Sequence, residues 1–147
     1  MAKIEHVLQF LDETFQPDTY PDYRNALNGL QVQGGDEVRS LGAAVDASEQ
    51  TLKAAAGAGI DFLLVHHGLF WDGLGPITGP RYRKLVTLLQ GGVGLYSLHL
   101  PLDAHPELGN NAVLLRGMGL APAGPFGSFE DTKIGWWAEA DMNRDEQ

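Results

Sequence analysis

Three histidines and one aspartate are placed where they could bind a metal ion. His66 and His67 directly follow one apolar segment, His99 directly follows another, and Asp103 comes four residues later. Imidazole nitrogen and carboxylate oxygen suit zinc, manganese, iron, cobalt or nickel, whereas calcium prefers oxygen ligands alone. The chain has no cysteine, which excludes thiolate metal sites, disulfides and a cysteine nucleophile.

The adjacent pair His66 and His67 favours two ions over one. Neighbouring side chains on a regular strand point to opposite faces, so the two rings could not share one ion there. At the end of a strand the backbone turns, and each imidazole can serve one of two neighbouring ions, with Asp103 as the bridging carboxylate. Such ions lie about 3.5–4 Å apart and can activate water. Spacing alone leaves a hydrogen-bonded, metal-free His pair equally open.

Five other side chains have both a structural and a functional interpretation. His99 can be a ligand, a support for the ligands or a group that faces substrate, and His105 is interpreted as structural or as supporting the ligands from outside. Asp46 ends an apolar segment, and we favour a role in capping the next helix over a role in orienting a ligand. The aromatic pair at residues 70–71 packs against the core or walls a substrate pocket.

Short apolar runs alternate with helical patterns along the chain. Unbroken apolar runs are typical of strands buried on both faces of a parallel sheet, and segments 16–37 and 68–80 have loop composition. The pattern predicts strands at 41–45, 62–65 and 93–98, helices at 4–15, 49–56, 82–89 and 111–118, and a further strand of undetermined direction at 134–138. We therefore predict a three-layer α/β fold with a mostly parallel sheet, whose ligands bind beyond the carboxyl ends of the strands.

Length and charge restrict the class of protein. The chain has 147 residues, which suits one domain, and its net charge is −9. An acidic balance disfavours nucleic acid as a partner, and the basic cluster Arg81, Arg83 and Lys84 is interpreted as a solvated helix face rather than a phosphate site. There is no signal-peptide pattern and no apolar run near the ~18 residues of a membrane span. The expectation is a cytoplasmic protein with no membrane contact.

Three motifs carry a family resemblance. They are Asn-Gly-Leu-Gln-Val at 28–32, Val-His-His-Gly-Leu-Phe-Trp at 65–71, and the long segment His-Leu-Pro-Leu-Asp-Ala-His-Pro-Glu-Leu-Gly-Asn-Asn at 99–111. In this order they closely resemble the dinuclear metal-centre family labelled GTP cyclohydrolase 1 type 2. The match covers roughly residues 4 to 120, and the third motif is highly specific.

The resemblance implies a metal site and an assembly. In the family motifs both histidines of the pair and the aspartate are ligands of two divalent ions, which here are His66, His67 and Asp103, and the histidine that matches His99 lies close to the metals. Family members form hexameric rings. Some are credited with opening the ring of GTP by hydrolysis, while others are discussed as metal-handling or regulatory proteins.

The sequence departs from the family pattern in one respect. Family members continue into a second α/β half that supplies a His-x-x-x-Glu motif, and this sequence, which stops at Gln147, contains none. We expect 1–125 to form the metal-site domain and 126–147 to be the start of the missing half, or a terminal strand with a frayed tail. Three side chains cannot fill two coordination spheres, since each tetrahedral ion needs about four donors.

Two functions follow as hypotheses. The first is a metal-dependent hydrolase half-site, in which activated water attacks an electrophilic carbon such as C8 of a purine nucleotide, with His99 as acid or base. The alternative is a non-catalytic metal-binding or regulatory protein that forms rings. A third possibility, a ring that encircles a partner, is disfavoured for nucleic acid by the negative charge.

Overall fold

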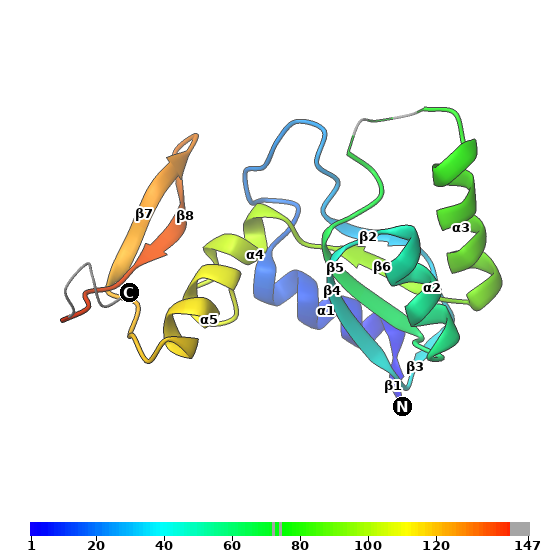
Figure 1. The fold of residues 1–147 in the computed structure, drawn as a ribbon, viewed down its shortest axis with the longest axis horizontal. Helices are drawn as coiled ribbons and strands as arrows, with labels where there is room; N and C mark the ends of the chain where they lie inside the picture. The colour runs from blue at the N-terminus through cyan, green and yellow to red at the C-terminus, as the bar shows by residue number, and fades with distance from the viewer. Residues whose placement is uncertain (72, 74, 142–147) are drawn as a thin grey trace. The chain divides into compact units, whose positions relative to one another are not determined.

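The computed structural model describes residues 1–71, 73 and 75–141. The chain divides into two compact units, Met1–His99 and Leu100–Gln147. The first unit holds the central sheet and the second holds two short helices and a hairpin (Figure 1).

A four-stranded sheet forms the centre of the first unit. Its strands lie in the order β2 (Gly29–Val32), β6 (Gly94–Ser97), β5 (Phe62–His67) and β4 (Leu41–Asp46). β4, β5 and β6 are parallel, and β2 is antiparallel to β6. The prediction of an α/β fold with a mostly parallel sheet is confirmed. The carboxyl ends of β4, β5 and β6 therefore meet at one edge of the sheet.

Helices cover both faces of this sheet. α2 (Glu49–Gly57) and α3 (Gly79–Gly91) pack against each other on one face, while α1 (Ile4–Phe15) lies on the other, where the hydroxyl of Tyr96 donates a hydrogen bond to Asp12 of α1. Burial and this hydrogen bond raise the pKa of the Tyr96 phenol far above its usual range. The first unit thus has the three layers that the sequence predicts.

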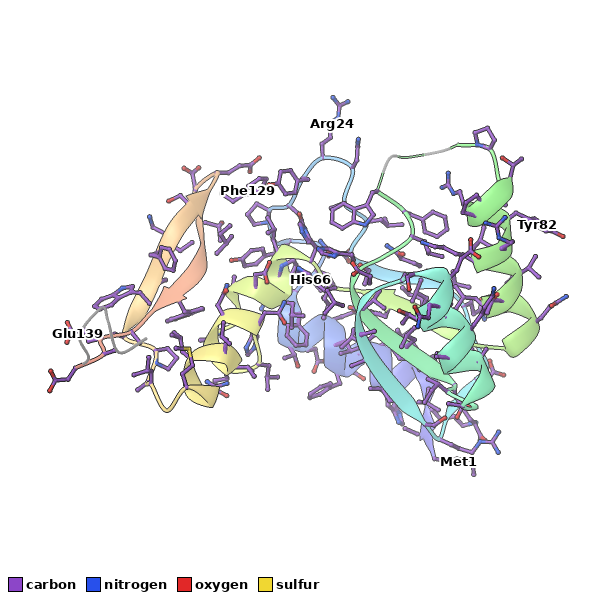
Figure 2. All side chains as sticks on the ribbon, viewed as in Figure 1. Met1, Arg24, His66, Tyr82, Phe129 and Glu139 are labelled. Atoms are coloured by element: carbon purple, nitrogen blue, oxygen red, sulfur yellow. The ribbon has the colours of Figure 1, made fainter. Side chains whose placement is uncertain are left out.

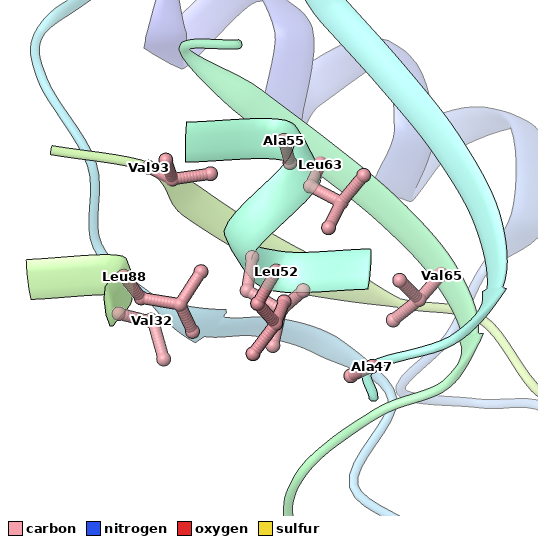
Figure 3. Packing of buried hydrophobic residues seen from close by; sticks show 9 residues of the cluster. Val32, Ala47, Leu52, Ala55, Leu63, Val65, Leu88 and Val93 are labelled. Carbon is pink, nitrogen blue, oxygen red and sulfur yellow. The ribbon is translucent and has the colours of Figure 1, made fainter. Parts of the chain in front are cut away.

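The main hydrophobic core lies between the sheet and the pair α2–α3 (Figure 3). Side chains from alternate positions of β5 and β6 meet side chains from the two helices, which is the arrangement expected of strands with a period of two. The cluster consists of Val32, Ala47, Leu52, Ala55, Leu63, Val65, Leu88, Val93 and Leu95.

Two expectations about the first unit are wrong. The segment 16–37, predicted as loop, contains β2, which pairs with β6 more than sixty residues away in the sequence. Its Asn-Gly and Gln residues are typical of loops, and the strand is stabilised by a partner that is distant in the sequence. Burial on both faces holds for β6 but not for β4, where Leu41 is 53% and Val45 is 62% exposed. β4 is the edge strand, and only one of its faces packs against the core.

Two further strands lie near the amino terminus. β1 (Ala2–Lys3) pairs antiparallel with β3 (Glu37–Val38), so the chain is tied down just before α1 begins. α1 itself ends at Phe15, where Gln16 adopts a left-handed conformation and its N–H bonds the carbonyl of Asp12. The predicted helix at 4–15 is confirmed.

The second unit is a short helical pair with a β-hairpin. α4 (Leu100–Ala104) and α5 (Asn110–Gly117) precede the antiparallel strands β7 (Gly124–Phe129) and β8 (Thr132–Trp137). α4, which contains Asp103, was not predicted, and β8 supplies the strand whose direction the sequence left undetermined. The predicted frayed tail beyond residue 141 lies outside the described residues.

Side-chain hydrogen bonds join the helices of the second unit to its hairpin. The indole Nε1 of Trp136 donates to the carbonyl of Ala104 at 2.9 Å, and the amide of Asn111 donates to the carbonyl of Ile134 at 3.0 Å. These bonds fix α4 and α5 against β8. Among the described residues, no helix is long and apolar enough to cross a membrane.

Candidate metal centre

His66, His67 and His99 form a cluster at the carboxyl edge of the sheet. His66 and His67 are the last two residues of β5, and His99 follows β6, the parallel neighbour of β5. Ring centroids lie 4.5 Å apart for His66 and His67 and 4.9 Å apart for His66 and His99. One ring nitrogen from each histidine lies within 4.8 Å of the other two. We call this group the histidine cluster; its member His66 is labelled in Figure 2.

The pair lies within β5 rather than after it, which differs from the prediction. Its rings nevertheless lie close together, although adjacent side chains on a regular strand point apart. The ladder between β5 and β6 ends at the pair Val65 and Ser97, and the carbonyl of His66 accepts a hydrogen bond from the hydroxyl of Ser97 instead of from the backbone of β6. The loss of pairing lets both rings face the same region beyond the sheet edge.

Each histidine of the cluster uses its Nδ1 in a hydrogen bond. For His66 the partner is the backbone carbonyl of Leu98, at 2.9 Å. For His67 it is a carboxylate oxygen of Asp46 at 2.6 Å, and for His99 a carboxylate oxygen of Asp22 at 2.8 Å. A carbonyl or an ionised carboxylate only accepts, so Nδ1 carries the proton in each neutral ring and Nε2 keeps its lone pair. This is how metal-ligating histidines are oriented in proteins.

A loop before β2 holds His99 in place. The side chains of His99 and Asp22 are only 12% and 6% exposed. The amide of Asn28 donates to the second carboxylate oxygen of Asp22 at 2.8 Å and accepts from the backbone N–H of His99, also at 2.8 Å. Asn28 thereby fixes both the carboxylate and the histidine that it orients. Asp22 was missed in the sequence, whereas Asn28 belongs to the first family motif, which gave no indication of this role.

Asp46 orients His67 rather than capping the next helix. The cap of α2 is Ser48, whose hydroxyl accepts from the N–H of Thr51 at 3.0 Å. Asp46 and His67 are direct partners across β4 and β5, so strand pairing places the carboxylate beside the ring. The preference for a capping role at Asp46 is therefore wrong.

Gln31 of β2 ties down the loop that follows the histidine pair. Its amide oxygen accepts from the N–H of Leu69 and its amide nitrogen donates to the carbonyl of Leu27, both at 2.7 Å. A Cβ atom at Gly68 would lie 2.4 Å from this amide. Glycine at 68 therefore allows the chain to leave β5 in close contact with Gln31, which connects the first two family motifs physically.

Aromatic side chains border the cluster. The indole of Trp71 meets the ring of His99 edge on, with centroids 4.5 Å apart and planes at 85°, and lies 5.9 Å from the ring of His67. Phe70 packs against the main core and carries the guanidinium of Arg81 at 5.3 Å from its ring centroid. Phe70 thus packs against the core, one of the two alternatives that the sequence left open, and the indole of Trp71 lies against the histidine cluster.

Asp103, the predicted bridging ligand, lies in the second unit. One of its carboxylate oxygens accepts from the amide of Asn110 at 3.0 Å, and its backbone carbonyl accepts from Asn111 at 3.1 Å. Its role as a ligand remains a proposal. His105 accepts from the N–H of Leu108 at 3.0 Å and so stabilises the turn between α4 and α5, which agrees with the structural interpretation.

The donor set suits a divalent transition metal. Three imidazole nitrogens on one side of an ion leave one or more positions for water or another ligand, the arrangement of catalytic rather than purely structural sites. The fold and the histidine cluster together define a class: an α/β protein with a candidate metal centre at the carboxyl ends of parallel strands.

Comparison with known proteins gives the family. The chain belongs to the Duf34/NIF3 (NGG1p interacting factor 3) family, whose model matches residues 2–146. A Deinococcus radiodurans protein named GTP cyclohydrolase 1 type 2 homolog is 49% identical over 131 residues, which cover 89% of this chain and 49% of that protein. A relative of the same name from Archaeoglobus fulgidus is 46% identical over 136 residues, covering 92% of this chain and 55% of the relative.

A solved structure has the same fold. The crystal structure of TTHA1606 from Thermus thermophilus superposes with a TM-score of 0.80 at 47% identity, covering 85% of this chain and 51% of that one. The chain therefore spans about half the length of the curated relatives it matches.

Proposed function

We propose that the protein binds two divalent metal ions and forms part of a hydrolase centre of the GTP cyclohydrolase 1 type 2 kind. The proposed ligands are His66, His67 and Asp103, with His99 as the acid–base residue. The observation that carries the proposal is the convergence of three imidazoles whose Nδ1 atoms are all held by hydrogen-bond acceptors. Two ions bound there would supply Lewis-acid activation of water and stabilisation of negative charge.

The residues of the chain account for the rest of the chemistry. Asp22 holds the Nδ1–H of His99, so proton transfer at this residue takes place at Nε2, on the side of the cluster. A carboxylate partner also stabilises the imidazolium that forms when His99 accepts a proton. Trp71 covers one side of His99 and limits access of bulk water.

A purine nucleotide is the proposed substrate class. The relatives carry the name GTP cyclohydrolase 1 type 2 homolog, and ring opening of a purine by water at C8 is a reaction that a two-metal site can perform. His99 would deliver or remove the proton at the ring nitrogen that is released.

Further donors must come from outside the three proposed ligands. Two ions need about eight donors in tetrahedral coordination, and water supplies only part of them. Since the chain spans about half the length of its relatives, we propose that the remaining ligands come from a segment equivalent to their second half, or from a neighbouring subunit of a hexameric ring.

Metal content tests the core of the proposal. Protein purified without chelator is expected to contain about one to two divalent ions per chain by elemental analysis. His66→Ala with His67→Ala should abolish loading, whereas His6→Ala, on the exposed part of α1, should leave it unchanged. A wild-type chain that neither contains nor takes up zinc, manganese, iron, cobalt or nickel would contradict the proposal.

Turnover is a separate test. Formate release from GTP with added zinc or manganese is expected for the wild-type centre in its complete form and should be lost in His99→Gln, which keeps its size and loses the titratable nitrogen. A full-length relative that loads metal and releases no formate would contradict the hydrolase assignment.

The second candidate function is a non-catalytic metal-binding or regulatory protein. What favours it is that the histidine cluster and the acceptors of its three Nδ1 atoms all lie within the first unit. In that case His99→Gln would change metal affinity and have no further effect on function.

A further inference from the structure

A pocket of about 390 Å³ lies in the first unit next to the residues that hold the histidine cluster. This volume falls within the range of small-molecule sites. One wall is formed by residues 24–27, the loop that directly precedes Asn28 and β2. The other wall is the loop after β5, in which Phe70 directly precedes Trp71. The lining consists of Arg24, Asn25, Ala26, Leu27, Phe70, Gly73, Gly75, Ile77 and Arg81.

The two walls are held together by hydrogen bonds. The N–H of Leu27 donates to the carbonyl of Phe70 at 3.3 Å. Gln31 bonds both loops, through the carbonyl of Leu27 and the N–H of Leu69. The parts of the two walls near Leu27 and Phe70 are therefore held in place by the same contacts that fix the end of β5.

The charged side chains in the described lining of the pocket are both positive, Arg24 and Arg81. Arg24 extends from the loop before β2 (Figure 2), and Arg81 stacks on Phe70 with a buried Nε that has no hydrogen-bond partner among the described residues. No Asp or Glu occurs in the described lining, although the sequence has 19 acidic and 10 basic residues. An unpaired buried guanidinium N–H costs free energy unless a ligand accepts its hydrogen bond.

The neighbouring basic residue behaves differently. Arg83 donates three hydrogen bonds to the carboxylate of Glu49, and this pairing raises the pKa of Arg83 and lowers that of Glu49. The interpretation of the basic cluster as a solvated helix face thus fits Arg83 and not Arg81, which is turned toward Phe70 and the pocket.

Apolar walls and guanidinium groups together define the chemistry of a ligand. We propose that this pocket binds a nucleotide, with its planar ring against Leu27, Phe70 and Ile77 and its phosphate on Arg81 and Arg24. Guanidinium groups pair with phosphate oxygens in a bidentate manner, and apolar and aromatic walls suit a heterocycle. This inference rests on the proposed function in one respect, since it takes the nucleotide to be the ligand of the neighbouring metal centre.

Binding to metal-free protein tests the pocket independently of the ions. After removal of metal with chelator, calorimetric titration should show binding of GTP and GMP, with guanosine at least about tenfold weaker because it has no phosphate. Arg81→Gln should weaken GTP about tenfold, the loss expected for a charged hydrogen bond. Arg39→Gln, an arginine at an exposed surface position, is the control and should bind GTP as the wild type does.

A second pair of variants separates charge from shape. Ile77 is 57% exposed, so Ile77→Asp should fold normally, as circular dichroism can verify. It adds a carboxylate to the pocket and should weaken GTP about tenfold or more relative to Ile77→Asn, a neutral side chain of the same size as Asp. Guanosine should not distinguish these two variants.

The outcomes are distinct for the pocket and for the metal centre. Absence of GTP binding to metal-free protein at millimolar concentration, or a GTP affinity that neither Arg81→Gln nor Ile77→Asp changes, overturns the pocket. If GTP binding depends on Arg81 but no metal loads, the proposed function fails and the pocket stands. If metal binds and neither Arg81→Gln nor Ile77→Asp changes the affinity for GTP, only the proposal of a nucleotide pocket is wrong.

Discussion

At the scale of single residues, the metal centre depends on groups that are not themselves proposed as metal ligands. Asp22, Asp46 and the carbonyl of Leu98 each hold one Nδ1 of the histidine cluster. Without such an acceptor an imidazole can rotate or change tautomer, and the nitrogen that faces the metal loses its lone pair in part of the population. The orientation of the rings is thus a property of their partners.

We predict that Asp22→Asn weakens metal binding at the cluster about 10–100-fold, the usual cost of losing a carboxylate that orients a ligand. The asparagine amide could present an N–H to Nδ1 of His99 and reverse its tautomer. Competition with a chromophoric chelator measures the affinity. Asp36→Asn, an exposed position, is the control; equal affinities for the two variants would show that Asp22 does not act through His99.

We predict that Gly68→Ala destabilises the first unit by about 1–3 kcal/mol, because the new Cβ pushes the Gln31 amide away from its hydrogen bonds to Leu27 and Leu69. Urea unfolding gives the free energy. In the double variant with Gln31→Ala the clash disappears, so the two effects should not add. Additive effects would mean that Gly68 is required for another reason, such as its backbone conformation.

At the scale of the elements, β2 is the strand that builds the site. It pairs antiparallel with β6, and this position brings Asn28 to His99 at its start and Gln31 to the loop after β5 in its middle. The exposed apolar side chains of β4, by contrast, mark an edge that the described helices leave uncovered.

The start of β5 is joined to β4 through Asp61, and this contact should depend on pH. The backbone N–H groups of Arg39 and Ser40 donate to its carboxylate at 2.8 and 3.0 Å and hold the pKa of Asp61 below its usual range. A lowered pKa in the folded state adds stability above the unfolded value of about 3.9. That stability is lost as the pH falls through the lower folded pKa.

We therefore predict that Asp61→Asn lowers stability at pH 7 and flattens the loss of stability as the pH falls below about 4. The measurement is the urea midpoint as a function of pH for wild type and variant. Asp36→Asn again serves as the control. Parallel curves for Asp61→Asn and wild type would contradict a lowered pKa at this carboxyl group.

At the scale of the whole molecule, stability and metal binding should be linked. An ion that binds only the folded state stabilises it by about 2.7 kcal/mol at a hundredfold excess over Kd, which corresponds to roughly 5–10 °C in Tm for a chain of this size. We predict such a rise on addition of zinc or manganese, measured by calorimetry. The same rise in the variant lacking His66 and His67 would place the ion elsewhere.

The number of metal ligands is also a property of the whole molecule. Three histidines converge in the first unit, Asp103 lies in the second, and the relatives are about twice as long as this chain. A centre with two ions is therefore proposed as a property of an assembly or of a longer polypeptide.

The sequence by itself determined the alternation of α1, α2, α3 and α5 with β4, β5 and β6, the mostly parallel sheet and the position of the histidines at neighbouring strand ends. It did not predict β1, β2, β3, α4 or β7. The features that it determined follow from local patterns, since apolar runs, capping residues and glycines report on the chain within a few residues. The motifs around His66 and His99 also identified the family, which the comparisons confirm.

Only the tertiary structure decided which groups orient the rings and which strand faces are covered. Asp22 and His99 are 77 residues apart in the sequence, and Asn28 and His99 are 71 apart, so no local pattern links them. Burial likewise depends on what lies across from a strand, which is why Val45 is exposed at the edge while β6 is buried at the centre. Hydrogen bonds and packing join groups through space, and sequence periodicity records only their separation along the chain.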